Sequence, residues 1–147
     1  MTFDEAIGFI TQELNLGPLS SDDAGHCSIT FDGDMAVELF PWNGGEELMF
    51  WSTLMSLDEE GMLSTEDFKK LLELNGPAIK YHEEVITIDR DANALVLYRA
   101  LALNHVTQDA LIEHLESFLN NLEFWLNIVK KESSTSSDTG SPFLILP

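Results

Sequence analysis

The feature that most constrains this fold is a repeated change in the spacing of apolar residues. In the first segment, TFDEAIGFITQELNLGP, apolar residues recur every three or four positions, which is typical of one face of a helix. They are Phe3, Ile7, Ile10 and Leu14. Thr2 and Glu5 have the spacing of a capping box, and Gly17-Pro18 predicts the end of the helix.

The spacing then changes to a period of two, which indicates β-strands. In HCSITFDGDMAVELF, two alternating runs flank Asp32-Gly33, a hairpin signal because both residues tolerate positive φ. The apolar positions are Cys27, Ile29 and Phe31 in the first run and Met35, Val37 and Leu39 in the second. After a turn at residues 43–45, the run from Leu48 to Leu54 is apolar on both faces, as in a central or interface strand.

The rest of the chain alternates between the same two periods. STEDFKKLLELNGP predicts a short helix, capped by Ser64 or Thr65 and ended by Gly76-Pro77. EEVITIDRDANALVLYRAL predicts two strands around a turn at residues 89–93. TQDALIEHLESFLNNLEFWLNIV predicts a long helix with Thr107 as its N-cap.

The expected order of elements is α-β-β-β-α-β-β-α, which indicates an α+β fold with an antiparallel sheet. We assign residues 1–130 to one domain of this kind. Residues 131–147 are rich in serine and threonine, and we expect them to form a disordered C-terminal tail.

The charge of the chain excludes several classes of partner. Its 147 residues include 26 acidic and 7 basic residues, which gives a net charge of −19. Nucleic acids and anionic membranes both need a basic surface, so neither is an expected partner. Cys27 is the single cysteine, and the N-terminal sequence lacks the pattern of a secretory signal, so a cytoplasmic protein is expected.

The stretch SLDEEGMLSTEDF, residues 56–68, is spaced almost like a calcium loop. With Gly61 at the glycine position, Ser56, Asp58, Glu60 and Asp67 would be the side-chain ligands. Ser56 lacks the first carboxylate, Asp67 is shorter than the expected glutamate, and β-rich segments flank the stretch. We therefore expect an acidic turn and a capped helix start without a metal, although an EF-hand-like calcium-binding protein remains an alternative.

No catalytic motif is evident. The histidines, such as His114 on the polar side of the last helix, are isolated in the sequence, and His26 and Cys27 would face opposite ways on a strand. The carboxylates fall on expected solvent faces and turns. We predict no enzymatic activity and no cofactor, and a small acidic enzyme of unknown reaction is the other alternative.

Large apolar side chains are numerous for a small α+β domain. They include the aromatic residues Phe3, Phe9, Phe40, Trp42, Trp51, Phe124 and Trp125. Two interpretations stay open, because the same residues could fill a core or could build a homodimer interface or a peptide-binding surface. An exposed strand edge would let an extended peptide add to the sheet.

The chain resembles the class I type III secretion chaperones, the CesT/SycE-like family of bacterial cytoplasmic proteins. The resemblance covers roughly residues 2–130, in the capped helix TFDEAIGFITQEL, the meander CSITFDGDMAVELF…ELMFWSTL and the short helix STEDFKKLLELN. It continues through ITIDRDANALVLYRAL and DALIEHLESFLNNLEFWL. GPAIKYHEEVITID is a looser match to the family pattern, and the serine-rich tail is an addition.

This resemblance implies a homodimer without catalytic activity, in the cytoplasm of a Gram-negative bacterium. It would bind the N-terminal segment of a virulence effector in extended form and keep it soluble and ready for secretion. The resemblance implies a dimer interface at Phe68, Leu71, Leu72, Val96 and Tyr98. It implies effector contacts at Phe3, Ile7, Ile10, Val37, Leu39 and Phe50.

Overall fold

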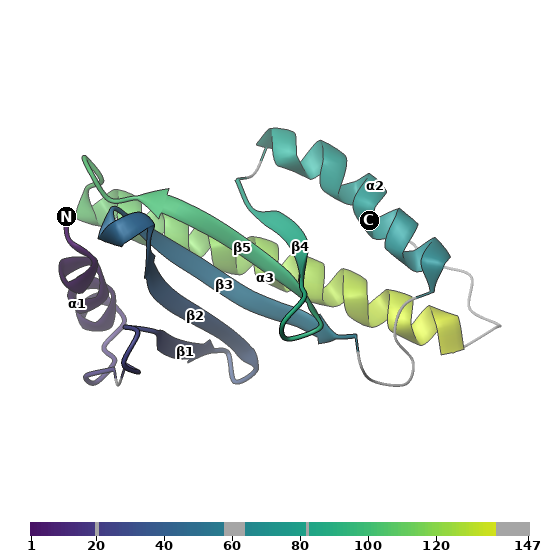
Figure 1. Cartoon of the computed structure of the whole chain (residues 1–147), viewed down its shortest axis with the longest axis horizontal. Helices are drawn as coiled ribbons and strands as arrows, with labels where there is room; N and C mark the ends of the chain where they lie inside the picture. The colour runs from purple at the N-terminus through teal and green to yellow at the C-terminus, as the bar shows by residue number, and fades with distance from the viewer. Residues whose placement is uncertain (20, 58–63, 82, 138–147) are drawn as a thin grey trace.

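The computed structural model describes residues 1–19, 21–57, 64–81 and 83–137, without the side chains of residues 78–81 and 131–137. Its elements are α1 (Phe3–Glu13), β1 (Cys27–Phe31), β2 (Met35–Trp42), the 3-10 turn η1 (Asn43–Gly45), β3 (Glu47–Ser56), α2 (Thr65–Tyr81), β4 (Val85–Asp89), β5 (Ala94–Ala102) and α3 (Gln108–Ser137). The described strands form one antiparallel sheet in the order β1-β2-β3-β5-β4 (Figure 1). The predicted α+β fold and its order of elements are confirmed.

The strand connections adopt the conformations that their residues favour. Asp32 and Gly33 have φ angles of 50° and 85°, and the Asp34 N–H donates a hydrogen bond to the Phe31 carbonyl. Asn93 likewise has a positive φ, of 49°, in the turn between β4 and β5. Aspartate, asparagine and glycine adopt this conformation at low cost, and the hairpin predictions are confirmed.

The helix caps also follow the sequence. Thr2 and Glu5 form the predicted capping box of α1. At α2 the Asp67 N–H donates to Ser64 Oγ over 3.2 Å, and the Ser64 N–H donates to Asp67 Oδ2 over 3.3 Å. Ser64 is therefore the N-cap of α2, and Asp67 is its reciprocal partner.

Two helices are longer than the sequence indicated. Gly76-Pro77 was expected to end α2, but α2 continues to Tyr81. Proline has a helical φ and forfeits one backbone hydrogen bond, so the helix can continue at a cost. α3 runs past Val129 to Ser137 and includes the start of the serine-rich segment, while the separate disordered tail at residues 131–147 stays a prediction.

The main core lies between one face of the sheet and the helices α1 and α3 (Figure 1). Cross-strand pairing places Leu39 opposite Phe50, and the Phe50 ring lies 5.5 Å from the ring of Phe118 on α3. Both rings are fully buried. The predicted alternation on β1 and β2 is confirmed, because every second side chain from Cys27 to Ile29 and from Met35 to Leu39 is buried.

The opposite face of the sheet carries a row of aromatic rings. His26 stacks on Phe40, with ring centroids 4.3 Å apart, and Trp51 stacks on Tyr98 at 5.8 Å. Phe40 and Trp51 join the two pairs at 6.1 Å. We call this side the outer face of the sheet, and among the described helices Figure 1 shows none that crosses it.

Candidate functional site

The edge of the sheet formed by β4 and α2 leaves large apolar side chains in contact with solvent. Leu72 and Leu74 on α2 are 64% and 42% exposed, and Ile88 on β4 is 48% exposed. Between these two leucines around the helix axis, Leu71 is buried in the main core. The apolar stripe of α2 is therefore buried at its centre and exposed at both flanks, and exposed apolar surface of this kind marks partner sites.

The residues expected at a dimer interface divide into two groups. Leu72 is exposed, and Phe68 and Tyr98 are half-buried. Leu71 and Val96 are buried within the single chain. The structure thus brings Phe68, Leu71 and Leu72 together on α2 and places Tyr98 on the outer face beside Trp51. Their role in a dimer stays a prediction.

The residues expected to contact an effector also divide. Phe3 and Ile7 on α1 are half-buried and lie against the core. Ile10, Val37, Leu39 and Phe50 are all at 0% exposure. In the described conformation all four lie within the core, Ile10 on α1 and the other three on the sheet, and they offer no surface of their own. Their direct contact with an effector stays a prediction.

A buried ionic cluster ties β4 and β5 to α3. The side chain of Arg99 on β5 is 5% exposed, and its Nη1 lies 3.5 Å from Glu84 Oε1, whose side chain is 2% exposed. Asn121 Nδ2 on α3 donates to Glu84 Oε2 over 3.0 Å. Arg99 Nη2 contacts Glu83 Oε2 at 2.8 Å and His114 Nδ1 at 2.6 Å. A guanidinium has donors only, so Arg99 Nη2 donates in the second contact and His114 Nδ1 accepts.

This cluster corrects two expectations from the sequence. The sequence predicts an isolated His114 on the polar side of its helix, but the residue is half-buried and bound to Arg99. Carboxylates were expected on solvent faces, but Glu84 and Asp67 are buried. In the sequence, only Arg99 indicated this cluster. It occupies an inward position of an otherwise apolar strand, and a buried charge requires a partner.

The loop before β1 is held by a single carboxylate. Asp22 Oδ1 accepts hydrogen bonds from the backbone N–H groups of His26 and Ala24, each over 2.9 Å. The His26 hydrogen bond is the largest cause of a lowered pKa at Asp22. Burial raises the pKa of the nearby Cys27 thiol, with the Asp22 charge as a second cause, so this cysteine is protonated rather than nucleophilic.

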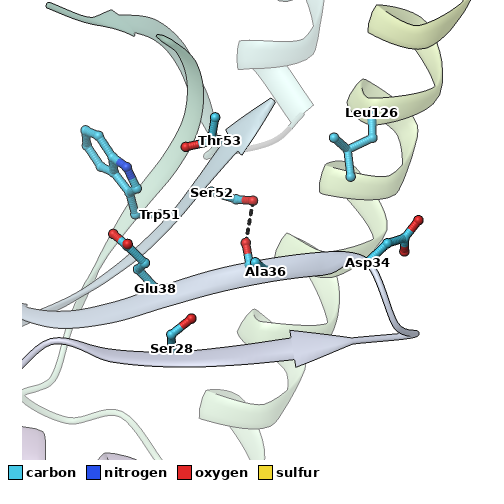
Figure 2. Close-up of a pocket in the computed structure, with 8 residues that line it drawn as sticks. All are labelled: Ser28, Asp34, Ala36, Glu38, Trp51, Ser52, Thr53 and Leu126. Atoms are coloured by element: carbon cyan, nitrogen blue, oxygen red, sulfur yellow. Dashed lines mark hydrogen bonds between the residues drawn. The ribbon is translucent and has the colours of Figure 1, made fainter. Parts of the chain in front are cut away.

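Between β2 and β3 the sheet opens into a small cavity of about 150 Å³. Figure 2 shows Glu38 and Trp51 at one side of the opening and Asp34 at the other, with Leu126 of α3 behind it. Ser52 Oγ donates to the Ala36 carbonyl across the gap over 2.7 Å. The lining of the cavity combines acidic side chains with the hydroxyl residues Ser28, Ser52 and Thr53 and with the apolar Leu126.

The sequence matches the Tir chaperone protein (CesT) family over residues 6–126. The chain belongs to this chaperone family. A search of curated protein sequences finds no match. The expectation from the sequence of a CesT-like, non-enzymatic chaperone is therefore confirmed at the level of the family.

Solved chaperone structures share the fold of this CesT-family chain. The chain is similar to the ExsC–ExsE complex, with a TM-score of 0.69, 21% identity and coverage of 85% of this chain and 91% of that one. It is similar to the HopA1–SchA chaperone–effector complex, with a TM-score of 0.67, 17% identity and coverage of 85% and 94%. It is also similar to the Yersinia pestis secretion chaperone SycH bound to a YscM2 fragment, with a TM-score of 0.60, 20% identity and coverage of 84% and 99%.

The structure describes only part of the calcium-like stretch at residues 56–68. Asp58, Glu60 and Gly61 of the calcium-like stretch lie outside the described residues. Asp67 caps α2 instead of facing a loop. Within the described part of the chain, no group of three or more histidine, cysteine, aspartate or glutamate side chains is arranged to hold a metal ion. Across the same residues, no helix is both long and apolar enough to cross a bilayer.

Proposed function

We propose that this CesT-family chain works in the bacterial cytoplasm as a homodimer that holds the N-terminal segment of a secreted effector in extended form. The observation that carries the proposal is the family match over residues 6–126. Solved relatives of the same fold support it, since they include the ExsC–ExsE and SchA–HopA1 complexes and the ExoU–SpcU heterodimer of Pseudomonas aeruginosa. The bound segment would be kept soluble and competent for secretion.

The proposed dimer forms through the edge of β4 and α2. Leu72, Leu74 and Ile88 provide exposed apolar surface on neighbouring elements of this edge. Phe68 and Tyr98 would contribute their exposed parts, while Leu71 and Val96 would support them from below. Burying such side chains gains roughly 25 cal/mol for each Å² of apolar surface, which favours association of two identical patches.

The proposed effector surface lies at the other end of the sheet, on α1 and β1. Phe3 and Ile7 are half-buried there, and β1 is an edge strand of the sheet. An extended segment could place apolar anchors against α1 and pair its backbone with β1. Ile10, Val37, Leu39 and Phe50 would support the shape of this surface from within the core, because all four are fully buried in the single chain.

Co-expression tests this function directly. The segment to test is the N-terminal part of any larger secreted protein that is encoded beside the gene for this chain. We expect the two to co-purify and light scattering to give a mass of two chaperone chains with one segment. A chaperone that elutes as a single chain and leaves the segment insoluble would contradict the proposal. The segment of an unrelated secreted protein is the control.

A further inference from the structure

The backbone of β1 alternates between facing β2 and facing the open edge of the sheet. In an antiparallel strand the N–H and carbonyl of one residue point to the same side, and successive residues alternate. The Phe31 carbonyl accepts from the Asp34 N–H within the hairpin over 3.2 Å, so Phe31 and Ile29 face β2. Ser28 and Thr30 therefore present their backbone groups to the edge.

The loop before β1 already occupies the start of this edge. Ser21 pairs with Cys27 as an isolated antiparallel bridge, and the Asp22 N–H donates to the His26 carbonyl over 3.1 Å. Asp22 Oδ1 accepts from the His26 N–H over 2.9 Å, so both backbone groups of His26 have partners. A further strand therefore cannot pair with this part of the edge.

The edge remains open at Thr30. In the described part of the chain, no hydrogen bond reaches the Thr30 backbone from the open side. Asp32 has a φ of 50° and begins the turn, so β1 ends at Phe31. An unpaired N–H and carbonyl on an edge strand form a template for another extended chain. Pairing with such a chain would therefore be centred on Thr30.

A groove of about 250 Å³ lies beside this edge, between the β1–β2 hairpin and α3. Its apolar lining consists of Phe31 and Met35 on the hairpin and Leu119 on α3. Met35 is buried, whereas Phe31 and Leu119 are half-buried and keep part of their apolar surface accessible. The other lining residues are exposed, and they are Asp32, Glu116, Asn120 and Glu123.

The open edge and the groove together fit an extended segment with one large apolar side chain. In a strand added at Thr30, the residue opposite Thr30 shares its outer face, and the next residue turns to the inner face beside Phe31. Because Phe31 lines the groove, that second side chain would enter it. A cavity of about 150 Å³ already holds benzene, so this groove has room for leucine or phenylalanine.

We propose that the extended segment held by this chaperone pairs with β1 at Thr30 and places one large apolar side chain in the groove between the hairpin and α3. The proposal rests on the proposed function for the source of the segment. It defines a register on β1 and a side-chain preference, which the surface on α1 alone does not give.

A pair of synthetic peptides tests the groove without knowledge of the effector. One peptide alternates threonine and glutamine around a central leucine, and the other has glutamine at the centre as well. We expect the leucine peptide to bind about tenfold more tightly and to shift the amide NMR signals of Thr30 and Phe31 and the methyl signals of Leu119. Equal binding of the two peptides, or shifts confined to α1, would overturn the proposal.

Thr30→Pro tests the register, because proline removes the N–H that faces the edge and is tolerated at such positions of edge strands. Thr30→Val is the matched control, since it keeps the N–H and a β-branched side chain. We expect the leucine peptide to bind about tenfold more weakly to Thr30→Pro and equally well to Thr30→Val. A weaker dimer with unchanged peptide binding would assign this edge to a second copy of the chain and reject the proposal.

Leu119→Asn tests the groove and leaves the backbone of β1 unchanged. Leu126→Asn is its control, because Leu126 is also half-buried on α3, seven residues further along, and does not line the groove. We expect about a tenfold loss of peptide affinity for Leu119→Asn only, and equal losses would contradict the assignment.

Co-purification of the effector segment separates this proposal from the proposed function. If Thr30→Pro and Leu119→Asn retain the segment as well as the unchanged chain does, the register and the groove are wrong and the function stands. If the unchanged chain captures no segment but binds the leucine peptide in the groove, the groove stands and the function is wrong.

Discussion

The two ends of the sheet use similar helices in different ways. At one end α1 turns its apolar stripe toward the core, with Ala6 and Ile10 fully buried and Phe3 and Ile7 half-buried. At the other end α2 buries Leu71 and leaves Leu72 and Leu74 facing solvent. The two helices have comparable amphipathic patterns, so the difference lies in how much of each stripe finds a partner within the chain.

This difference suggests separate roles for the two ends. An apolar stripe that stays exposed in the single chain favours permanent association, because its exposure to water is costly. A half-buried stripe can open or accept a further segment at a lower cost. We therefore assign the β4 and α2 end to the dimer and the α1 and β1 end to the effector, and the following predictions test this division.

The largest expected effect comes from the ionic cluster that fixes the β4 end to α3. Arg99→Leu leaves Glu84 buried without its cation. Breaking a buried pair in this way costs about 3–5 kcal/mol of folding free energy. Urea denaturation followed by circular dichroism would measure the loss.

Glu83→Gln is the matched control for Arg99→Leu. The Glu83 side chain is 72% exposed, and exposed ion pairs contribute at most about 1 kcal/mol. If both variants lowered the free energy of unfolding equally, the stabilisation by this cluster would not depend on the buried Arg99–Glu84 pair.

The second prediction concerns the dimer. Leu72→Asp places a charge in the proposed interface, at an expected cost of about 2 kcal/mol, which weakens association about thirtyfold. Light scattering over a dilution series measures the dimer. Phe124→Asp is the control, because Phe124 is an exposed apolar residue on α3 rather than on α2. A dimer that survives Leu72→Asp but not Phe124→Asp would move the interface to α3.

The third prediction concerns the effector surface. Ile7→Thr keeps the shape of α1 but lowers its apolar surface, and we expect about a tenfold weaker hold on the effector segment with an unchanged dimer. Competition with labelled segment measures the affinity. Loss of the dimer in this variant, with segment binding intact, would reverse the two assignments.

The smallest expected effect is a pH dependence at the loop before β1. The folded pKa of Asp22 is lowered, so its ionised form stabilises the fold above its ordinary pKa of 3.8, and this stabilisation is lost as the pH falls through the lowered value. Asp22→Asn should therefore lower the melting temperature at neutral pH but not at strongly acidic pH. A constant difference across this range would exclude titration of Asp22 as the cause.

Local sequence rules predicted the architecture because local geometry determines it. Neighbouring residues alone determine three of the predicted features. These are the spacing of three and four in α1, the alternation in β1 and β2, and the positive φ at Asp32 and Gly33. α2 continues beyond Gly76-Pro77. The low helix propensity of glycine and proline only adds a free-energy cost, and tertiary packing can outweigh that cost.

The functional surfaces were harder to predict, because burial depends on which face of the sheet the helices cover. Alternation correctly grouped Val37 with Leu39, but it could not show that α1 and α3 bury both completely. The opening beside Ser52 depends on where two strands stop pairing, which no residue spacing encodes. The contact of Arg99 with His114 joins a strand and a helix, and their proximity arises only in the folded chain.

Hydrogen exchange of the free chaperone and of its complex with the effector segment tests the division of roles most directly. We predict that the amides of α2 and β4 are already protected in the free dimer and do not change, while exchange in α1 and β1 slows when the segment binds. Slower exchange in α2 and β4 on binding, with no change in α1 and β1, would contradict the account.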